Sequence, residues 1–238
     1  PLIVQFYGNQ PETILNAARL VEGKCDAIDI NFGCPQGIAK RGNYGSFLLE
    51  QYDLITSIVR TLHQNLSTPV TCKVRIMKTE ADTLRMVKGL QDAGCSILTV
   101  HGRTRDQLKE RVGSCNFDMI KKVKEHLSIP VFANGGIMDL NDIERCMQYT
   151  GVDGVMTSEG ILCNPAIFAG IRVPALEMAR EYLDFADKYN AGDMPVRGHL
   201  FKILFRELAH YTDLRSKLGE SKRFMFRDIL NELEQRDA

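Results

Sequence analysis

The sequence lacks an excess of charge of either sign, a long apolar run and a closely spaced pair of cysteines. Its 30 basic and 30 acidic residues cancel. The whole chain therefore carries no electrostatic signature of nucleic-acid binding, and such binding would need a local patch. No apolar run approaches the roughly 18 residues of a membrane-spanning helix, and no signal peptide is visible. We therefore expect no membrane association.

The seven cysteines are scattered along the chain and include no Cys-x-x-Cys pair. This pattern argues against a disulfide framework and against a zinc site. We therefore expect no metal and a reducing compartment, which predicts a cytoplasmic or nuclear location, or both. Cys25, Cys95 and Cys146 fall on or beside predicted helices and strands, and we expect them to be small buried hydrophobic residues.

Short apolar segments alternate with helical segments between residues 2 and 157. Strands are predicted at residues 2–6, 26–30, 69–76, 96–100, 130–133 and 152–157. Among the helices between them, Thr79 with Asp82 is expected to begin one, and Asn141 with Glu144 is expected to cap another that ends at Tyr149. Such alternation predicts parallel β-α units.

Polar residues and glycines gather at or after the C-terminal ends of nearly every predicted strand. They include Asn31, Cys34, Lys73, Arg75, His101, Arg103, Asn134, Gly135, Gly136 and Ser158. Working residues take this position in a β/α barrel, whereas a doubly wound sheet would gather its ligand groups near one switch point. We therefore predict an α/β fold, a (β/α)8 TIM barrel with six of its eight strands in this chain. The missing N-terminal strands would most simply precede Pro1.

After Pro174 the sequence predicts helices at 176–189, 199–211 and 221–234 with no strand between them. The middle helix carries an apolar stripe of helical spacing at Leu200, Ile203, Leu204, Leu208 and Tyr211. We therefore divide the chain into a barrel domain, residues 1–172, and a small all-α helical domain, residues 173–238. The helical domain has a modest basic segment, which we interpret first as a solvated helix face, at Lys217, Lys222, Arg223 and Arg227.

Lys73 and Arg75 lie two residues apart on a predicted strand, so both side chains point to one face and Val74 points to the other. Unpaired charges are very costly to bury. The two cations therefore need an anionic or electron-rich ligand, or else acidic partners such as Asp29 in a buried ion-pair layer. We favour the ligand, because the pair lies near a strand end.

His101 also sits at a strand end and is interpreted as a ligand contact rather than as a core histidine. Asn134-Gly135-Gly136 either offers backbone N–H groups to a phosphate or forms a plain tight turn, and both interpretations stay open. Ser158 and Glu159 follow the last predicted strand, where the phosphate sites of β/α barrels tend to lie.

Several of these segments together resemble the signature of the tRNA dihydrouridine synthases. The first is Asp-Ile-Asn-Phe-Gly-Cys-Pro at residues 29–35, followed by Lys-Arg-Gly at 40–42 and by Gly45. The resemblance continues at residues 72–75, 99–104, 133–135, 154–156 and 164–165, and so covers about residues 2–170 in order. The tail, with Val-Arg-Gly-His-Leu-Phe-Lys at 196–202, is similar to the family's C-terminal helical domain. The likeness is strongest to the eukaryotic branch that acts on D-loop positions 16 and 17.

The resemblance implies an FMN-dependent reduction of the C5=C6 bond of a uridine in folded tRNA, with NADPH or NADH as the reductant. It implies that Cys34 gives a proton to C5 as the general acid. It also implies that Gln5 and Lys73 contact the isoalloxazine ring, where a cation stabilises the reduced flavin. Asn31 would hold the uracil or the flavin, and Arg75 would face the uracil or its phosphate.

The remaining roles follow from the same resemblance. The ribityl chain and phosphate of FMN would be held by His101, Asn134, Gly135, Gly136, Ser158 and Glu159. Many bacterial members carry Gly-Arg where this chain has Ser158-Glu159, so the phosphate would rely here on Ser158 and backbone N–H groups. Lys40 and Arg41 would lie on a loop that faces the tRNA, the helical domain would bind tRNA, and we expect a monomer.

Two alternatives remain beside this hypothesis. One is an FMN-dependent oxidoreductase that acts on a free pyrimidine, like the dihydroorotate dehydrogenases; the helical tail argues against it, because a small substrate needs no extra domain. The other is a non-catalytic RNA-binding remnant, which would have no use for Cys34. The resemblance also leaves out a segment, because the family's first strand carries an Ala/Thr-Pro-Met flavin contact that has no counterpart here.

Overall fold

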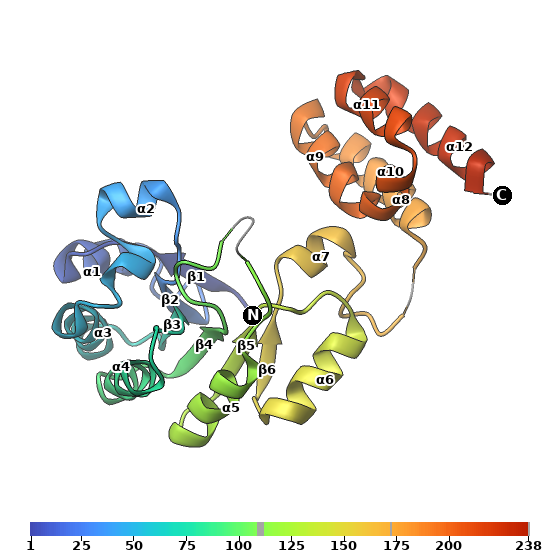
Figure 1. The fold of residues 1–238 in the computed structure, drawn as a ribbon. Coiled ribbons are helices and arrows are strands. Elements are labelled where there is room, and N and C mark those ends of the chain that lie inside the picture. Colours follow the sequence, from blue (N-terminus) through green and yellow to red (C-terminus); the bar gives the residue numbers. More distant parts are fainter. Residues whose placement is uncertain (109–111, 172, 238) are drawn as a thin grey trace. The chain divides into compact units, whose positions relative to one another are not determined.

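The structure is a computed structural model that describes residues 1–108, 112–171 and 173–237. The chain divides into two compact units (Figure 1). The first comprises Pro1–Gly136 and Ile143–Met156, and the second comprises Ile137–Asp142 and Thr157–Ala238. Within the described ranges, no helix has both the length and the apolar character needed to cross a membrane.

The first unit is built around a six-stranded sheet whose strands lie side by side in sequence order. The strands are β1 (Ile3–Phe6), β2 (Ala27–Phe32), β3 (Val70–Arg75), β4 (Ile97–His101), β5 (Val131–Asn134) and β6 (Gly154–Met156). Each predicted strand is present, and all neighbouring pairs are parallel. The fold is therefore α/β and is consistent with part of a β/α barrel.

Helices connect the successive strands. They are α1 (Pro11–Arg19), α2 (Gly37–Gly42), the 3-10 turn η1 (Gly45–Leu48), α3 (Tyr52–Asn65), α4 (Glu80–Asp92), α5 (Phe117–His126) and α6 (Leu140–Thr150). Helices α1, α3, α4 and α5 pack against one another in that order. In Figure 1 they form a row along one side of the sheet. The sequence predicted neither α2 nor η1, because both lie in a short glycine-rich segment without a long apolar period.

The two faces of the sheet differ sharply in polarity. One face carries fully buried apolar side chains at Ile28, Ile30, Phe32, Cys72, Val74, Leu98, Val100, Val131 and Ala133. The other face carries polar side chains at Gln5, Asp29, Asn31, Thr71, Lys73, Arg75, Thr99, His101 and Asn134. Because side chains alternate along a strand, one face forms the core under the helices and the other is left for polar chemistry.

The helix starts confirm one predicted cap and correct another. Thr79 Oγ1 accepts a hydrogen bond from Asp82 N–H at 3.1 Å and begins α4, as predicted. The predicted cap at Asn141 is wrong. Asp139 Oδ1 accepts the N–H of Asp142 at 2.9 Å, and α6 begins at Leu140, so Asn141 lies inside the first turn. Asp139 and Asn141 are both residue types that cap helices, and their positions in the sequence do not show which of the two forms the cap.

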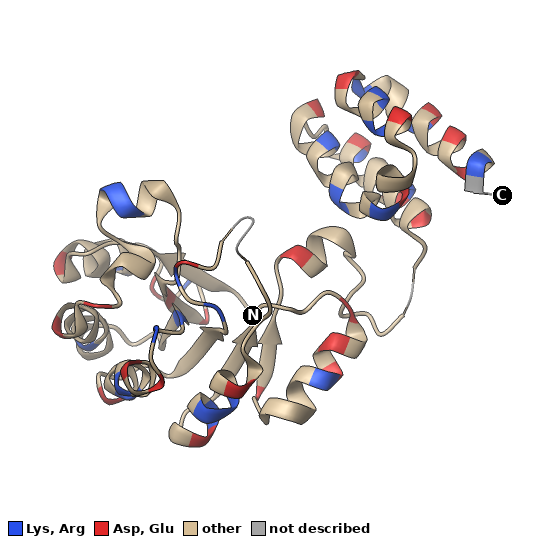
Figure 2. Ribbon diagram, in the orientation of Figure 1, with Lys and Arg blue, Asp and Glu red and all other residues tan. Residues whose placement is uncertain are grey.

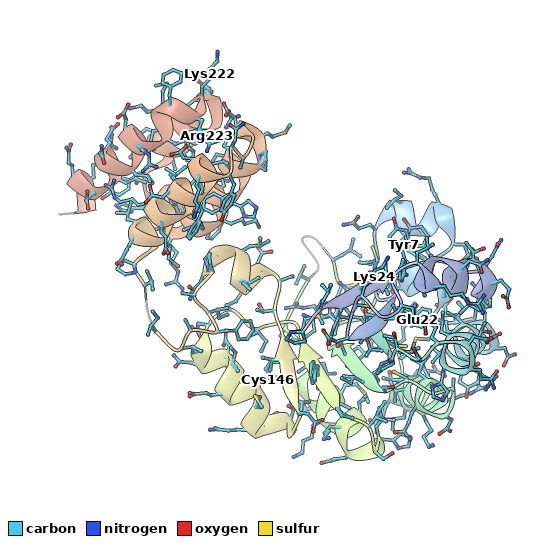
Figure 3. The ribbon with its side chains drawn as sticks, turned by 180° about the vertical axis from the view of Figure 1, so that it is seen from behind. Tyr7, Glu22, Lys24, Cys146, Lys222 and Arg223 are labelled. Carbon is cyan, nitrogen blue, oxygen red and sulfur yellow. The ribbon has the colours of Figure 1, made fainter. Side chains whose placement is uncertain are left out.

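The three cysteines expected in the core differ in their burial. Cys95 and Cys146 are buried, and Cys146 is labelled on α6 in Figure 3. Cys25 is only partly buried, so the expectation of a buried side chain is wrong for this residue. It follows the turn after α1, where its thiol lies 3.5 Å from the carbonyl oxygen of Val21.

The second unit is helical and has its own apolar core. Its elements are α7 (Glu159–Cys163), α8 (Ala175–Lys188), α9 (Asp193–Ile203), α10 (Phe205–His210), α11 (Thr212–Glu220), the 3-10 turn η3 (Arg223–Met225) and α12 (Phe226–Asp237). The predicted stripe is confirmed, because Leu200, Ile203, Leu204 and Leu208 are buried in this core and Tyr211 packs against it. The single helix predicted at 199–211 is wrong, since the chain leaves helical geometry at Leu204 between α9 and α10. The apolar stripe continues on both sides of this break, so the hydrophobic period of the sequence does not reveal it.

The basic segment of the second unit, in which Figure 3 labels Lys222 and Arg223, is largely neutralised by acidic partners. Lys217 pairs with Glu232, Arg223 pairs with Asp187, and Arg227 pairs with both Asp184 and Asp187. Lys222, by contrast, is exposed and has no hydrogen-bond or ion-pair partner among the described residues. This agrees with the interpretation of most of the segment as a solvated, ion-paired helix face.

Candidate active site

The strand register aligns the predicted site residues in rows across the polar face of the sheet. In the first row, Gln5 is opposite Asp29 and Asp29 is opposite Thr71. In the second row, Asn31 is opposite Lys73. In the third, Arg75 is opposite His101, which is opposite Asn134. Partner residues on parallel strands project to the same side, so the structure brings these side chains together at the carboxyl end of the sheet.

A chain of hydrogen bonds runs from the deepest row to the loop that holds Cys34. Asp29 accepts hydrogen bonds from Thr71 Oγ1 and from Gln5 Nε2, each at 2.6 Å. Gln5 Oε1 in turn accepts Asn31 Nδ2–H at 3.0 Å. Burial raises the pKa of Asp29, whereas the hydrogen bonds from Thr71 and Gln5 oppose that rise. Asp29 therefore anchors a polar network. It forms no ion pair with any described residue, so the structure does not show the buried ion-pair layer that the sequence left open for Lys73, Arg75 and Asp29.

Asn31 shapes the start of the Cys34 loop. Its Oδ1 accepts the backbone N–H groups of Gly33 at 3.0 Å and Cys34 at 2.9 Å. A side-chain oxygen that accepts N–H groups two and three residues ahead forms a local Asx-type turn. Both polar ends of Asn31 are thus used inside the protein, one on Gln5 and one on the loop.

The other side of the Cys34 loop is held by the segment after α2. The carbonyl oxygen of Cys34 accepts hydrogen bonds from the N–H of Ser46 at 3.0 Å and from its hydroxyl at 2.9 Å. Gly45 has a positive φ of 64°, and a Cβ atom there would lie 2.7 Å from the same carbonyl oxygen. A glycine is therefore needed at 45 for both its backbone conformation and its close approach to Cys34.

Replacing Gly45 with alanine should lower stability and displace the Cys34 loop. The left-handed backbone alone costs a non-glycine residue about 1–2 kcal/mol, and the contact with the Cys34 carbonyl adds to it. Gly23→Ala is the matched control, because Gly23 also has a positive φ, of 73°, but has open space around it. Urea unfolding should show a larger loss for Gly45→Ala than for Gly23→Ala. Equal losses would contradict the close packing of Gly45 under Cys34.

Arg75, the last residue of β3, joins the loop after β2 to the loop after β4. Its Nε donates to the carbonyl oxygen of Gly33 at 3.0 Å, and its Nη1 donates to the carbonyl oxygens of Thr104 at 2.8 Å and Gln107 at 3.2 Å. The side chain is buried, with 8% of its surface exposed. Arg75 therefore fixes the Cys34 loop against the loop after β4.

Lys73 differs from Arg75 because its ammonium has no hydrogen-bond or ion-pair partner within the described part of the chain. Burial, together with repulsion from Arg75, lowers the pKa of Lys73 to about 8, although Asp29 and Cys34 oppose the shift. A half-buried, unpartnered cation beside a strand end is suited to an anionic or electron-rich ligand.

His101 is held in its neutral form. Burial, together with repulsion from Arg75, Lys73 and Arg103, lowers its pKa to about 3. Its Nε2 lies 3.2 Å from Nη1 of Arg103. Because an arginine can only donate, Nε2 is the acceptor and the ring proton lies on Nδ1. His101 can therefore offer a neutral N–H donor to a ligand.

Two glycines make a close backbone turn after β5. Gly135 and Gly136 have positive φ values of 97° and 73°, and a Cβ atom on Gly135 would lie 2.7 Å from Cδ2 of His101. Neither glycine N–H donates a hydrogen bond to any of the described residues. Asn134 itself is buried, and its side-chain amide donates to the carbonyl oxygen of Met156 at 2.8 Å. The turn can therefore present two free N–H groups to an anion, whereas the Asn134 side chain is already engaged.

The remaining predicted residues are not members of these rows. Lys40 and Arg41 are exposed in the last turn of α2. Ser158 and Glu159 belong to the second unit, where Glu159 Oε1 accepts a hydrogen bond from Lys202 Nζ at 2.5 Å. Glu159 is thus neutralised by a lysine of its own unit.

The sequence did not single out Ser46, Thr71 or the pairing of Arg103 with His101. The place of Thr71 on the polar face could have been predicted, because it lies two residues before Lys73 and four before Arg75 on the same strand. Ser46 gave no such signal, because its bond to Cys34 depends on the path of the chain through α2. Among the residues that the structure describes, no group of three or more His, Cys, Asp or Glu could hold a metal ion.

The chain is similar in sequence to a set of tRNA-modifying enzymes. A sequence model of the family described as dihydrouridine synthase (Dus) matches residues 1–238. A Mus musculus protein named as a tRNA-dihydrouridine(16/17) synthase, NAD(P)(+)-like, is 49% identical over 223 residues, which are 93% of this chain and 47% of that protein. The Saccharomyces cerevisiae tRNA-dihydrouridine(16/17) synthase is 45% identical, over 92% of this chain and 55% of that protein. A mouse tRNA-dihydrouridine(20a/20b) synthase-like protein is 37% identical, over 86% and 63%.

This chain spans about half the length of the first two of these relatives. Among solved structures, it resembles a Pseudomonas aeruginosa protein provisionally assigned as a dihydrodipicolinate synthetase, with a TM-score of 0.50 and 17% identity over 98% of this chain and 82% of that one. A mandelate racemase/muconate lactonizing family protein from Azoarcus sp. EbN1 also has a TM-score of 0.50, with 15% identity over 86% and 48%. These structural likenesses concern the fold alone.

Proposed function

This chain belongs to the dihydrouridine synthase family, and on that basis we propose that it reduces the C5=C6 bond of a uridine in the D-loop of tRNA. The proposed cofactor is FMN, and the proposed reductant is NADPH or NADH, since the relatives' names include NAD(P). The single observation that carries the proposal is the placement of Cys34. Its loop is fixed at the carboxyl end of the sheet by Asn31, Ser46 and Arg75, in the same constellation as the unpartnered cation Lys73.

The fold that we propose for the whole protein is an eight-stranded β/α barrel, of which this chain supplies six consecutive strands. We propose that residues 173–238 form a helical domain that contacts tRNA, and that the protein is a monomer located in the cytoplasm, the nucleus or both. Positions 16 and 17 of the D-loop are the proposed targets, because the relatives of highest identity named above are synthases for those positions.

The polar face of the sheet suits the chemistry of FMN. Lys73 offers an unpartnered ammonium to the electron-rich edge of the isoalloxazine ring, and Gln5 lies one row below it. Neutral His101 offers Nδ1–H, and Gly135 and Gly136 offer two free N–H groups to a phosphate. Asn134 contributes by beginning that turn. Phosphate contacts from Ser158 and Glu159 stay predictions from the sequence, and the structure pairs the Glu159 carboxylate with Lys202.

Reduced FMN, when bound, supplies the hydride that adds to C6 of the uracil. Cys34 supplies the proton, which passes from its Sγ to C5. Asn31 and Ser46 hold the backbone of Cys34 on both sides, so the thiol is presented from a fixed turn. Arg75 holds the same turn against the loop after β4 and, through this contact, helps to shape the space in which the uracil would lie.

Purified protein loaded with FMN should reduce uridine in unmodified tRNA when NADPH or NADH is supplied, and tRNA binding should weaken steeply with salt. Dihydrouridine in the tRNA product can be measured by mass spectrometry of nucleosides. Free uracil and orotate are the controls. Turnover of either free base without tRNA would overturn the proposal in favour of a small-pyrimidine oxidoreductase. Binding of tRNA without any dihydrouridine would instead support a non-catalytic RNA-binding protein.

A further inference from the structure

A pair of stacked tyrosines, of which Tyr7 is exposed and Tyr44 partly buried, stands beside the Cys34 loop. Tyr7, just after β1, and Tyr44, just after α2, have ring centroids 4.5 Å apart and an interplanar angle of 27°. Tyr7 is 62% exposed, and its position is labelled in Figure 3. Tyr44 is less exposed and packs against Gly42, where a Cβ atom would lie 2.4 Å from the Tyr44 ring. We call Tyr7 and Tyr44 the tyrosine platform.

The platform is tied directly to the segment that fixes Cys34. Tyr44 lies two residues before Ser46, whose N–H and hydroxyl both donate to the Cys34 carbonyl oxygen. Tyr44 also lies within electrostatic reach of Cys34, because burial first, and then Tyr7 and Cys34, raise the pKa of the Tyr44 phenol. The tyrosine platform therefore lies beside the Cys34 loop.

Helix α2 places free positive charge next to the platform. Its sequence, Gly-Ile-Ala-Lys-Arg-Gly, has no acidic residue, and Figure 2 shows basic colour without acidic colour on this helix. Lys40 and Arg41 are exposed and have no hydrogen-bond or ion-pair partner within the described ranges. Elsewhere in the first unit, the exposed Lys122 is paired with Glu80, and the partly buried Lys124 is paired with Asp153. In a chain of zero net charge, α2 is thus a local excess of positive charge.

An exposed aromatic surface beside unpaired cations has the chemistry that recognises single-stranded nucleic acid. Bases stack on aromatic rings largely irrespective of their identity, and adjacent cations follow the phosphates. We propose that the tyrosine platform stacks the base of a nucleotide that neighbours the target uridine in the RNA chain, while Lys40 and Arg41 contact its flanking phosphates. This inference rests on the proposed function, because it requires that RNA enters the site at Cys34.

A stacked neighbour would help to hold the target uridine out of the folded RNA. A uridine that reaches the partly buried Cys34 thiol must leave its own stack, and its neighbour then loses a stacking partner. The exposed ring of Tyr7 would replace that partner. The alternative is that the two rings merely fasten the segment after β1 to the segment after α2.

The test compares variants that keep or remove an aromatic ring at position 7. Tyr7→Trp and Tyr7→Phe keep a stacking surface, whereas Tyr7→Leu keeps an apolar side chain without one. An unmodified tRNA transcript carries 2-aminopurine at the nucleotide next to the target uridine. We expect binding of wild-type protein to quench its fluorescence, Tyr7→Trp and Tyr7→Phe to retain the quenching, and Tyr7→Leu to lose it and to weaken tRNA binding by roughly tenfold.

Tyr149→Leu is the matched control, because Tyr149 is an exposed tyrosine of the same unit, 50% exposed, whose ring stacks on no other aromatic ring among the described residues. It should leave tRNA affinity unchanged. Unchanged quenching and affinity in Tyr7→Leu would overturn the platform, and so would equal losses in Tyr7→Trp and Tyr7→Leu. Thermal unfolding shows whether Tyr7→Leu is folded.

If Tyr7→Leu does not fold, Lys40→Gln with Arg41→Gln provides the second test, since both side chains are exposed. The double variant should make the slope of log affinity against log salt concentration less negative by about 1.4 to 1.8. An unchanged slope would overturn the phosphate contacts. Failure of the proposed function looks different, because wild-type protein would then form no dihydrouridine in tRNA, whatever its tRNA affinity.

Discussion

Replacing Cys34 with alanine should lower the rate of dihydrouridine formation by about a hundredfold to ten-thousandfold, the range that a positioned general acid contributes. The physical reason is that C5 of the uracil needs a proton, and the account places that proton on Cys34 Sγ. The loop itself should survive, since it is held by the backbone of Cys34 through Asn31 and Ser46 rather than by the thiol. Single-turnover formation of dihydrouridine in tRNA measures the effect.

The controls separate the thiol from the fold around it. Cys25→Ala removes another partly buried cysteine of the same unit and should leave the rate unchanged. Flavin content and the rate of flavin reduction by NADPH should stay normal in Cys34→Ala, since neither step uses the thiol. A Cys34→Ala protein that forms dihydrouridine at the wild-type rate would exclude Cys34 as the proton donor.

Replacing Lys73 with methionine should weaken FMN binding and slow flavin reduction, while Lys73→Arg should retain more of both. Methionine keeps the apolar length of the side chain but removes the unpartnered charge, which the account assigns to the electron-rich edge of the flavin. Fluorescence titration of the apoprotein with FMN and stopped-flow reduction by NADPH measure the two effects. Normal flavin affinity and normal reduction in Lys73→Met would contradict this role.

The lowered pKa of Lys73 gives this prediction a pH dependence. Free protein loses the Lys73 proton as the pH rises through about 8, so FMN affinity should fall above that pH in the wild type and not in Lys73→Met. Stability should change in the opposite direction. The unfolded chain keeps the lysine proton up to its usual pKa of about 10.4, so it binds more protons than the folded protein between about pH 8 and that value. The free energy of unfolding should therefore rise with pH in this window through Lys73.

The sheet and the shared face of the two cations were predictable because side chains alternate between the two faces of a strand. Apolar runs marked each strand, and the two-residue spacing of Lys73 and Arg75 placed both side chains on one face. The structure confirms both points. The turn formed by Asn31 was also within reach of the sequence, since an asparagine two residues before a glycine and three before Cys34 suits an Asx turn.

The partners of Arg75 and the clamp of Ser46 on Cys34 were not predictable in the same way. Both depend on backbone carbonyl groups that the fold brings together from loops 12 to 42 residues apart. Every residue has a carbonyl group, so no residue type marks these acceptors in the sequence. The same limit applies to Tyr7 and Tyr44, which lie on separate segments and meet only after β1 and α2 are placed.

The most direct test of the account is to map dihydrouridine in the tRNA of cells that lack this protein, restored with the wild-type or the Cys34→Ala protein. If Cys34 is the proton donor, we expect dihydrouridine to disappear from D-loop positions 16 and 17, to return with the wild-type protein and not to return with Cys34→Ala. Full dihydrouridine at these positions without the protein, or its return with Cys34→Ala, would contradict the account.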